Sequence, residues 1–525
     1  PTSVSSSSVA SARLPASAAA TTSTSSVGKM TDNGEILEPQ GDHHAWYSLQ
    51  PFLEAGKWSS TPGTYFKEMK EKNGGAPIYK AHPGLKVITI TDHASGKWFF
   101  SQPDTVLDRQ ARRKGRNTPP PLASPPNQGG QRFGPLKCKE EYLGNGLPAL
   151  VTNAMEKHEG ARDYIVAVFR ERLAATDTAL EHATANFYKD LWANGMGDYT
   201  TVYDLFLQQS YAFVLEWIFG MGEEGGQPLP PYKDFRTVNP LDLSVLIGLE
   251  VDTPVANLAS KVAQAVAGGV SSEEKASVEV LLEAIRSSKM WPSFTKMLEE
   301  SGLPTQDMDK SFMFFSGFQS SSALAKNMEY CVGSLAANPD FLAELRAELD
   351  GQQELTIKSV SDAKRFPLLD SFHWEILRLY PAPQFFFKTA QMDLVVPTSS
   401  GARYQVRKGD MLCCHHPLIH IDEAVFGADA TEFKPKRFIG NPGLKDDVFA
   451  YAFPKPSEPG RVEGMPWGCA AHTVGVLDGI LKVFYGRWVQ EAEWEMKEPP
   501  IIDPVEYLGV VGPDGLGFAK VTPRK

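Results

Sequence analysis

The chain has 525 residues, of which 42% are hydrophobic and 10% aromatic, as in a large globular protein with an extensive core and unlike a disordered chain. Its net charge of −11 argues against nucleic acid or an anionic membrane surface as the main partner. Five cysteines do not form a disulfide framework in a chain of this length, which suits a reducing compartment. No uninterrupted apolar run reaches the roughly 18 residues that a membrane anchor needs.

Residues 1–31 are rich in Ser, Ala and Thr and contain no acidic residue before Asp32. This composition is typical of an organelle transit peptide and favours a plastid location, with the cytoplasm as the other location considered. The alternative is a disordered tail of no functional consequence. Either way we exclude 1–31 from the fold and expect one domain over 32–525.

The periodicity of apolar residues predicts a mainly α fold with a minor β part. A short helix is expected over 61–73 and a β-branched strand over 86–91, followed by a long loop over 112–135 that is rich in Pro, Gly and Arg. Helical periodicity dominates from 147 to 349, with breaks near 220–231 and 268–272. The apolar stretch 202–219 is interrupted by Asp204 and Glu216, so it is interpreted as a buried helix.

After Pro381 the pattern changes to short strands and loops. One further helix is expected after Cys469, and strand-like segments end the chain. No internal repeat and no second core is visible, so a single large domain is predicted.

Three short patterns in the second half of the chain can carry chemistry or hold a site together. Glu375 and Arg378 lie late in a predicted helix with i, i+3 spacing, which puts both charges on one face. Arg437 lies in the segment 433–438, between two phenylalanines, and can join Glu375 and Arg378 in one network. Cys469 precedes the last long helix, whose N-terminus stabilises a thiolate, and a thiolate is a ligand for haem iron. Taken singly, these patterns are also consistent with an exposed ion pair, a loop salt bridge and a buried structural cysteine.

In this order and at these separations, the three patterns resemble the cytochrome P450 superfamily. Glu375 and Arg378 match its helical Glu-x-x-Arg, residues 433–438 match its Phe-x-Pro-x-Arg-Phe segment, and Cys469 falls in its haem-thiolate loop. The resemblance covers residues 60–522. It implies a single large haem-thiolate fold, haem b with Cys469 as the axial ligand of the iron, and a structural network of Glu375, Arg378 and Arg437.

The haem loop departs from the family pattern at three positions, where this chain has Val462, Trp467 and Ala471 in place of Phe, Arg and Gly. The missing Arg removes a partner of a haem propionate. The replacements considered are His158 and Arg162, with i, i+4 spacing on one helical face, and Lys388. An exposed charged surface is the alternative interpretation of these residues.

The most informative departure lies in a helix predicted over 307–335. Oxygen-activating members of the superfamily carry an acid and a Thr where this chain has Gln319 and Ser320. An amide cannot relay protons as a carboxyl group does, whereas a hydroperoxide arrives with its O–O bond already formed. The pattern resembles the allene oxide synthase and hydroperoxide lyase clan, whose members carry Asn there, and this chain is a divergent relative. Alternatively, Gln319 only hydrogen-bonds a buried carbonyl.

The resemblance also implies an apolar slot for an acyl chain. Its candidate residues lie in the 307–335 helix and in the aromatic run after Pro381; they are Phe315, Phe318, Phe385, Phe386 and Phe387. The run Cys413 to His416, with His420 nearby, suggests a metal site at first sight. Adjacent residues on a strand point to opposite faces, so a structural segment is favoured instead.

The clan resemblance implies an enzyme that rearranges polyunsaturated fatty-acid hydroperoxides by homolytic O–O cleavage, without a reductase or O2. We expect an epoxyalcohol or a related oxygenated isomer, because the longer amide of Gln319 can keep the hydroxyl near the carbon radical. The allene oxide synthase and hydroperoxide lyase outcomes remain alternatives. So do an NADPH- and O2-dependent monooxygenase and a haem-binding protein without catalysis. No membrane anchor is expected, although peripheral membrane contact is compatible with the sequence.

Overall fold

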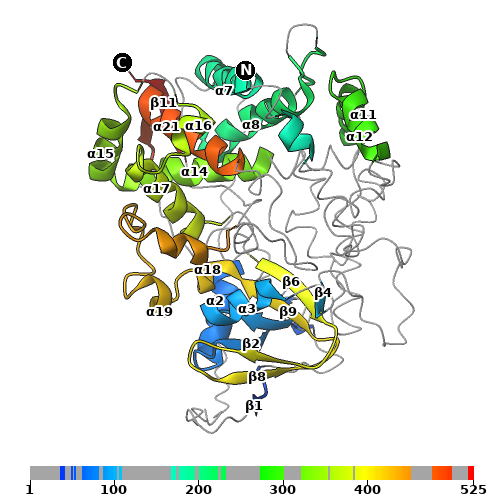
Figure 1. Cartoon of the computed structure of the whole chain (residues 1–525), viewed down its shortest axis with the longest axis vertical. Helices are drawn as coiled ribbons and strands as arrows, with labels where there is room; N and C mark the ends of the chain where they lie inside the picture. Colours follow the sequence, from blue (N-terminus) through cyan, green and yellow to red (C-terminus); the bar gives the residue numbers. More distant parts are fainter. Residues whose placement is uncertain are drawn as a thin grey trace, which may run out of the picture.

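The computed structural model describes most of the second half of the chain and several segments of the first half. The described residues are 36–41, 49–50, 53–54, 62–81, 87–102, 106–108, 167–172, 177–194, 200–222, 226–231, 272–300, 321–352, 355–381, 385–450, 476–498 and 518–524. Helices gather at one end of the molecule and a five-stranded sheet at the other (Figure 1).

The helical end is built around α8 (Val202–Phe219), a helix that is buried along almost its whole length. α7 (Asp177–Asn194) and α14 (Ser321–Ala337) pack along it. α21 (Val476–Glu491) packs against α14, and its Phe484 inserts between the rings of Phe187 and Phe213. One large apolar core therefore joins segments that are almost 300 residues apart in the sequence.

Shorter helices surround this core. They are α11 (Ser272–Arg286), α12 (Trp291–Glu300), α15 (Pro339–Leu349) and α16 (Ile357–Val360). The segment that begins α16 lies close to α21, because two glycines of α21 leave room for it. A Cβ on Gly479 would lie 2.5 Å from Cγ2 of Ile357, and one on Gly486 would lie 2.4 Å from Cδ1 of Leu355. These two glycines therefore set how closely α16 and α21 approach.

The main sheet has the strand order β2-β3-β9-β6-β4. Its strands are β2 (Ile78–Ala81), β3 (Val87–Ile90), β9 (Met411–His415), β6 (Phe385–Ala390) and β4 (Leu107–Asp108). β3 and β9 run parallel, with Ile88 opposite Leu412, while the other pairs are antiparallel. Two helices from the same end of the chain, α2 (Pro62–Lys72) and α3 (His93–Ser101), lie beside this sheet (Figure 1).

Two three-stranded sheets complete the β part. One has the order β1-β8-β7 and comprises β1 (Ile36–Leu37), β8 (Arg403–Val406) and β7 (Leu394–Pro397). The other has the order β10-β11-β5 and comprises β10 (Ala492–Met496), β11 (Phe518–Pro523) and β5 (Thr200–Thr201), so it lies at the helical end.

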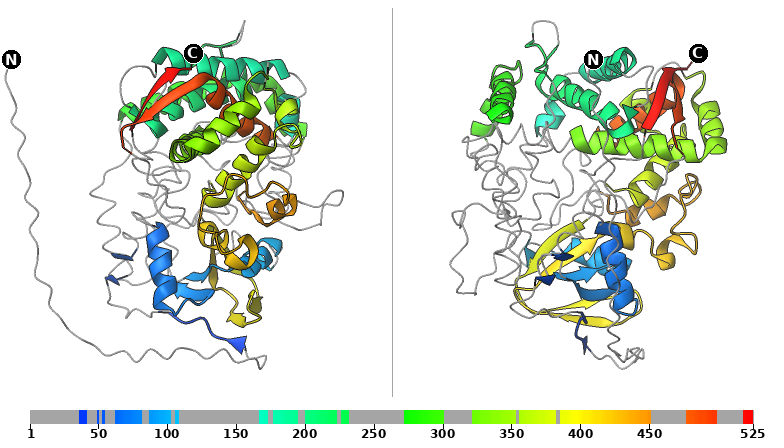
Figure 2. Two further views of the ribbon diagram at one scale, coloured as in Figure 1. Left: turned by 90° about the vertical axis from the view of Figure 1, so that its left-hand side faces the viewer. Right: turned by 180° about the vertical axis from the view of Figure 1, so that it is seen from behind.

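α17 (Pro367–Leu379) runs from the helical end towards the sheet (Figures 1 and 2). Next to it lie α18 (His416–Ile419), α19 (Glu423–Phe426) and the 3-10 helix η3 (Pro442–Asp447). α17 therefore contacts α14, α15 and α21 of the helical end and, through Arg378, the residue that follows α18.

Several sequence predictions are confirmed by these elements. The helix expected over 61–73 is α2, the strand over 86–91 is β3, and the buried helix over 202–219 is α8. The strands after Pro381, the helix after Cys469 and the terminal strands are also present. The loop 112–135 and the first part of the predicted helix 307–335 lie outside the described residues.

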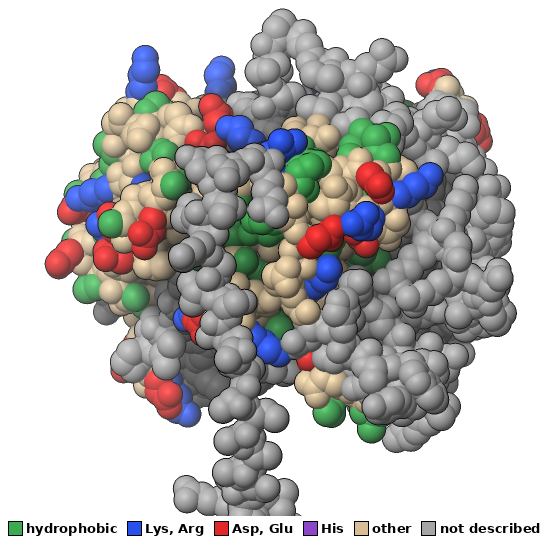
Figure 3. Space-filling view, turned by 90° about the horizontal axis from the view of Figure 1, so that it is seen from below, with side chains coloured by type: hydrophobic (Ala, Val, Ile, Leu, Met, Phe, Trp, Pro, Cys, Tyr) green, Lys and Arg blue, Asp and Glu red, His purple; other side chains and the backbone are tan. Residues whose placement is uncertain are grey.

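Among the described residues, no helix combines the length and the apolar character needed to cross a bilayer. Figure 3 shows the molecule from the side opposite the helical end. Basic and acidic side chains alternate over the coloured part of this face. The excess negative charge of the chain is therefore not gathered into one patch on the described part of this face.

Candidate functional site

The structure describes some of the predicted site residues and not others. Glu375, Arg378, Arg437, Lys388 and Phe386 are described in full. Phe385 and Phe387 are described as backbone positions of β6. The predicted residues that lie outside the described part are Cys469, Gln319, Ser320, Phe315, Phe318, His158 and Arg162.

α17 carries the centre of the described site, and its ends are well defined by the sequence. Pro367 occupies its first turn, where a missing N–H costs nothing. The carboxylate of Glu348 accepts hydrogen bonds from the N–H groups of Leu368 and Leu369, at 2.8 and 2.9 Å, so it caps the helix start. The helix ends at Leu379 because Pro381 disfavours helical geometry in the residue before it.

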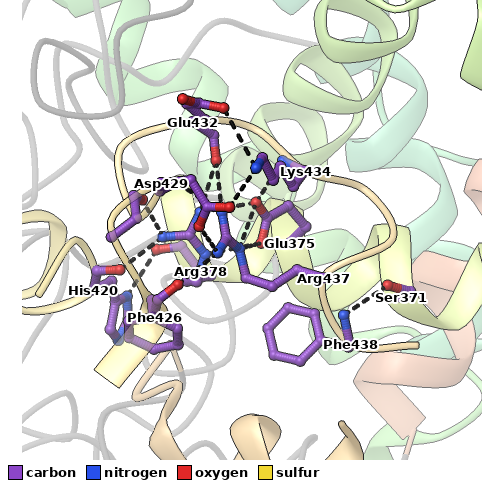
Figure 4. Close-up of polar contacts among 11 residues, drawn as sticks. Ser371, Glu375, Arg378, His420, Phe426, Asp429, Glu432, Lys434, Arg437 and Phe438 are labelled. Atoms are coloured by element: carbon purple, nitrogen blue, oxygen red, sulfur yellow. Dashed lines mark hydrogen bonds and ion pairs between the residues drawn. The ribbon is translucent and has the colours of Figure 1, made fainter. Parts of the chain in front are cut away.

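The Glu375–Arg378 pair is completely buried on one face of this helix. The guanidinium donates Nε–H to Oε2 and Nη2–H to Oε1 of Glu375, both at 2.8 Å, in a bidentate pair. Its remaining hydrogen bonds go to main-chain carbonyls of the following loops. Nη1 donates to the carbonyls of His420 (2.7 Å) and Ala430 (2.6 Å). A third carbonyl, that of Glu432, accepts from Nη2 at 3.1 Å, and Figure 4 shows these bonds converging on one arginine.

Arg437 joins this network from the other side of Glu375 (Figure 4). Its Nε lies 3.2 Å from both oxygens of Glu375, and its Nη1 donates to Oδ1 of Asp429 at 2.6 Å. Hydrogen bonds from Lys434 and Arg437 lower the pKa of Asp429 to about 2. The structure thus brings Glu375, Arg378 and Arg437 together, and it adds Asp429, which the sequence analysis did not single out.

His420 is a second residue that the sequence analysis did not assign to this network. Arg378 donates to the carbonyl of His420, and Nδ1 of His420 lies 2.8 Å from the carbonyl of Arg378. The N–H of Phe449 donates to Nε2 of His420 at 2.8 Å. Because a main-chain N–H can only donate, Nε2 is the acceptor and the proton of this neutral ring is on Nδ1. His420 therefore connects the end of α17 to the chain at Phe449.

Lys388 lies on β6 with its side chain buried. Its Nζ donates to the carbonyls of Phe99 (2.9 Å) and Gln102 (3.2 Å), and it lies 4.8 Å from the centre of the Phe99 ring. These carbonyls belong to the C-terminal end of α3, where unpaired carbonyls favour a cation. This contact accounts for the described position of Lys388, and its contact with a haem propionate stays a prediction.

Phe386, on β6 of the main sheet, is partly buried and packs against a core cluster. Its ring centre is 5.8 Å from that of Phe100 and 5.2 Å from that of His416. In the β6–β9 register, Phe385 is opposite His415 and Phe387 is opposite Cys413. The predicted role of these phenylalanines in an acyl slot stays a prediction.

The run Cys413 to His416 comprises the end of β9 and the first residue of α18. Cys413 and Cys414 are both completely buried, in two different core clusters. Among the described residues, no group of three or more His, Cys, Asp or Glu side chains is arranged to hold a metal ion. Burial raises the pKa of both thiols. Burial and the neighbouring His416 together lower the pKa of His415 to about 3.

The described cysteines also bear on which thiolate can hold a haem. Cys331, Cys413 and Cys414 are free thiols, each completely buried, and burial raises the pKa of each. Each of the three side chains packs inside an apolar core cluster and is therefore poorly placed to face a haem. Cys138 and Cys469 lie outside the described residues, and Cys469 precedes a described long helix, α21.

Comparison with known proteins gives the family of this chain. A sequence model of the cytochrome P450 family matches residues 311–453, which include the Glu375–Arg378–Arg437 network. An epoxyalcohol synthase of Ectocarpus siliculosus is 93% identical over 496 residues, which are 94% of this chain and 100% of that protein. The chain belongs to the cytochrome P450 family. A haem-thiolate iron is therefore its cofactor.

Two further relatives in this family are named as hydroperoxide bicyclases. One, from Ectocarpus siliculosus and named mitochondrial, is 52% identical over 94% of this chain and 92% of its own length. The other, a mitochondrial hydroperoxide bicyclase of Plasmodiophora brassicae, is 29% identical over 90% of this chain and 81% of its own length. The names of all three relatives agree with the resemblance to the hydroperoxide-rearranging clan.

The buried network yields a prediction about stability. Glu375→Gln preserves the shape of the side chain but leaves the buried guanidinium of Arg378 without its counter-charge. We expect a loss of about 3–5 kcal/mol in the free energy of unfolding, measured by chemical denaturation. The half-exposed pair Arg524–Asp350 is the control: Asp350→Asn is expected to cost about 1 kcal/mol or less. Equal losses for the two variants would contradict this account.

The buried histidines yield a prediction about pH. Burial lowers the pKa of His373, His415 and His420 below the usual 6.5. Below pH 6.5 the unfolded chain therefore binds protons that the folded chain does not, so stability falls as the pH falls. Each such histidine contributes a slope of up to about 1.4 kcal/mol per pH unit.

Denaturation at a series of pH values from 7 to 5 measures this slope. His373→Gln, which cannot titrate, is expected to reduce the slope by the share of one histidine. A slope that is the same in the variant and in the wild type would show that His373 does not contribute to it.

Proposed function

We propose that this chain is a haem-thiolate enzyme that rearranges polyunsaturated fatty-acid hydroperoxides, with an epoxyalcohol as its main product. The observation that carries the proposal is the 93% identity to an epoxyalcohol synthase over the whole length of that protein. At this identity, few positions remain at which a different reaction could be encoded. The cofactor is proposed to be haem b, with Cys469 as the ligand of the iron.

The reaction is an isomerisation, so it needs no external oxidant or reductant. The bound haem-thiolate supplies homolytic cleavage of the O–O bond, which the electron-donating sulfur favours. The alkoxyl radical of the substrate then adds to its neighbouring double bond and gives an epoxide with an allylic carbon radical. The hydroxyl group released from the peroxide returns to this carbon. All atoms of the hydroperoxide are thus found in the epoxyalcohol, and no reductase is required.

The residues of the chain have distinct proposed roles in this scheme. Gln319 holds the hydroxyl released from the peroxide by a hydrogen bond and keeps it near the carbon radical, with Ser320 next to it. Phe315, Phe318 and the run 385–387 line the acyl chain, where each buried methylene contributes about 0.8 kcal/mol. His158, Arg162 and Lys388 contact the propionates. The haem domain is proposed to comprise 32–525, with 1–31 as a leader segment outside it.

The location of the protein is also a proposal. The relatives named as hydroperoxide bicyclases are both named mitochondrial. These names favour a mitochondrial leader over the plastid one that the composition of residues 1–31 suggested. Peripheral contact with a membrane is also proposed, because the proposed substrate is lipid-derived.

One assay tests the proposed function. The purified holoprotein is mixed with positional isomers of linoleic acid hydroperoxide, without a reductase or NADPH, and the products are identified by mass spectrometry. We expect rapid loss of the hydroperoxide and epoxyalcohols as the main products. Bicyclic products would instead favour the activity for which the 52% identical relative is named. An absence of turnover without a reductase would contradict the proposal.

A second experiment tests the role of Gln319. Gln319→Ala removes the amide, and we expect turnover to fall roughly tenfold, the effect of losing a buried hydrogen bond of about 1.4 kcal/mol, with a smaller share of epoxyalcohol. Gln319→Asn, which restores the amide on a side chain one methylene shorter, is the matched control and is expected to recover part of the turnover. Unchanged turnover and products in Gln319→Ala would show that the amide has no part in the reaction.

A further inference from the structure

Two stretches of chain flank the segment that contains Cys469, and both are bound to α17. The stretch before it includes η3 and ends at Ala450, and the stretch after it begins with α21 at Val476. Cys469 lies in the sequence between them. The contacts that each flank makes with α17 therefore determine where this segment starts and where it ends.

Asp370, in the first turn of α17, binds both flanks with one carboxylate. Its Oδ1 accepts from Nζ of Lys482 on α21 at 2.5 Å, and its Oδ2 accepts from Nζ of Lys445 on η3. The side chains of Asp370 and Lys482 are 8% and 7% exposed, so this is a buried cluster and not a surface ion pair. Burial alone would raise the pKa of Asp370, but the two lysines hold this pKa below its usual value.

Two histidines make further contacts between α17 and the flanks, one at His373 and one at the carbonyl of Arg378. Nε2 of His373 lies 3.1 Å from Oδ1 of Asp478, in the first turn of α21. At the other flank, His420 joins the carbonyl of Arg378 to the N–H of Phe449, as described above. Each flank is thus held to α17 by more than one contact, and the carboxylate of Asp370 contacts both flanks directly.

We propose that Asp370 is a positioning residue for the haem ligand, because its carboxylate ties both flanks of the Cys469 segment to α17. The proposal rests on the assignment of Cys469 as the ligand. Removing the carboxylate takes away one contact of each flank at once and leaves the buried ammonium of Lys482 without a counter-charge. The two ends of the Cys469 segment are then less firmly fixed to α17, and a thiolate ligand in this segment would be more easily replaced or protonated.

The experiment compares variants of the full-length holoprotein by the absorption spectrum of the ferrous–CO complex, whose Soret band distinguishes a thiolate-ligated haem from one that has lost the thiolate. For Asp370→Asn, at a temperature below unfolding, we expect the ratio of the thiolate-ligated form to the form that has lost the thiolate to fall roughly tenfold. Lys445→Met and Lys482→Met each remove one contact of one flank and are expected to give smaller falls, roughly threefold each.

Ser371→Ala is the matched control. The Ser371 hydroxyl accepts from the N–H of Phe438 at 3.1 Å, so its loss also removes a buried contact between α17 and the stretch before Cys469, but only at one flank and without leaving a charge unpaired. We expect this variant to lose stability, measured by thermal unfolding, and to retain the wild-type spectrum. If Asp370→Asn does not yield folded holoprotein, the two lysine variants carry the test, because each retains one contact.

The possible outcomes separate this proposal from the assignment on which it rests. A wild-type complex without the thiolate band would contradict the assignment of a thiolate ligand itself. A wild-type thiolate band that is unchanged in Asp370→Asn, or in both lysine variants, would overturn only the positioning role of Asp370. A spectral change in Ser371→Ala as large as that in Asp370→Asn would also overturn it, because any loss of packing on α17 would then have the same effect.

Discussion

The bidentate pair between Glu375 and Arg378 is the interaction on which the rest of the described site depends. Both side chains are completely buried, so the pair is tolerable only because every charged group has partners. Those partners are main-chain carbonyls at His420, Ala430 and Glu432, in loops without regular structure of their own. The arginine thus provides the hydrogen bonds that a sheet or helix would otherwise supply, and the loops are ordered around it.

The same helix performs a second task on a different face. Glu375 and Arg378 order the loops that precede η3, while Asp370 and His373 contact α21. α17 is therefore a common reference for elements that come before and after Cys469 in the chain. The proposed ligand Cys469 benefits from this arrangement, because the described elements on both sides of it are positioned by one helix.

The sequence was informative where the signal is local. The i, i+3 spacing of Glu375 and Arg378, the alternation of strand faces at Cys413 and Cys414, and the apolar length of α8 are each visible in a short window. The partners of Asp370 and His420 were not predictable, because Lys482 and Phe449 reach them only through the packing of distant elements. Lys388 shows the same limit, since its contact with the end of α3 depends on β6 being placed beside that helix.

The parallel pairing of β3 with β9 has a consequence for synthesis of the chain. Ile88 finds its partner only when Leu412 has left the ribosome, and β2 pairs on the other side of β3. Until then, the β2–β3 hairpin presents an apolar, β-branched edge that another nascent chain could extend. One edge of this short hairpin thus stays without its partner strand through most of translation, so production is expected to be sensitive to chaperone supply and to the rate of elongation.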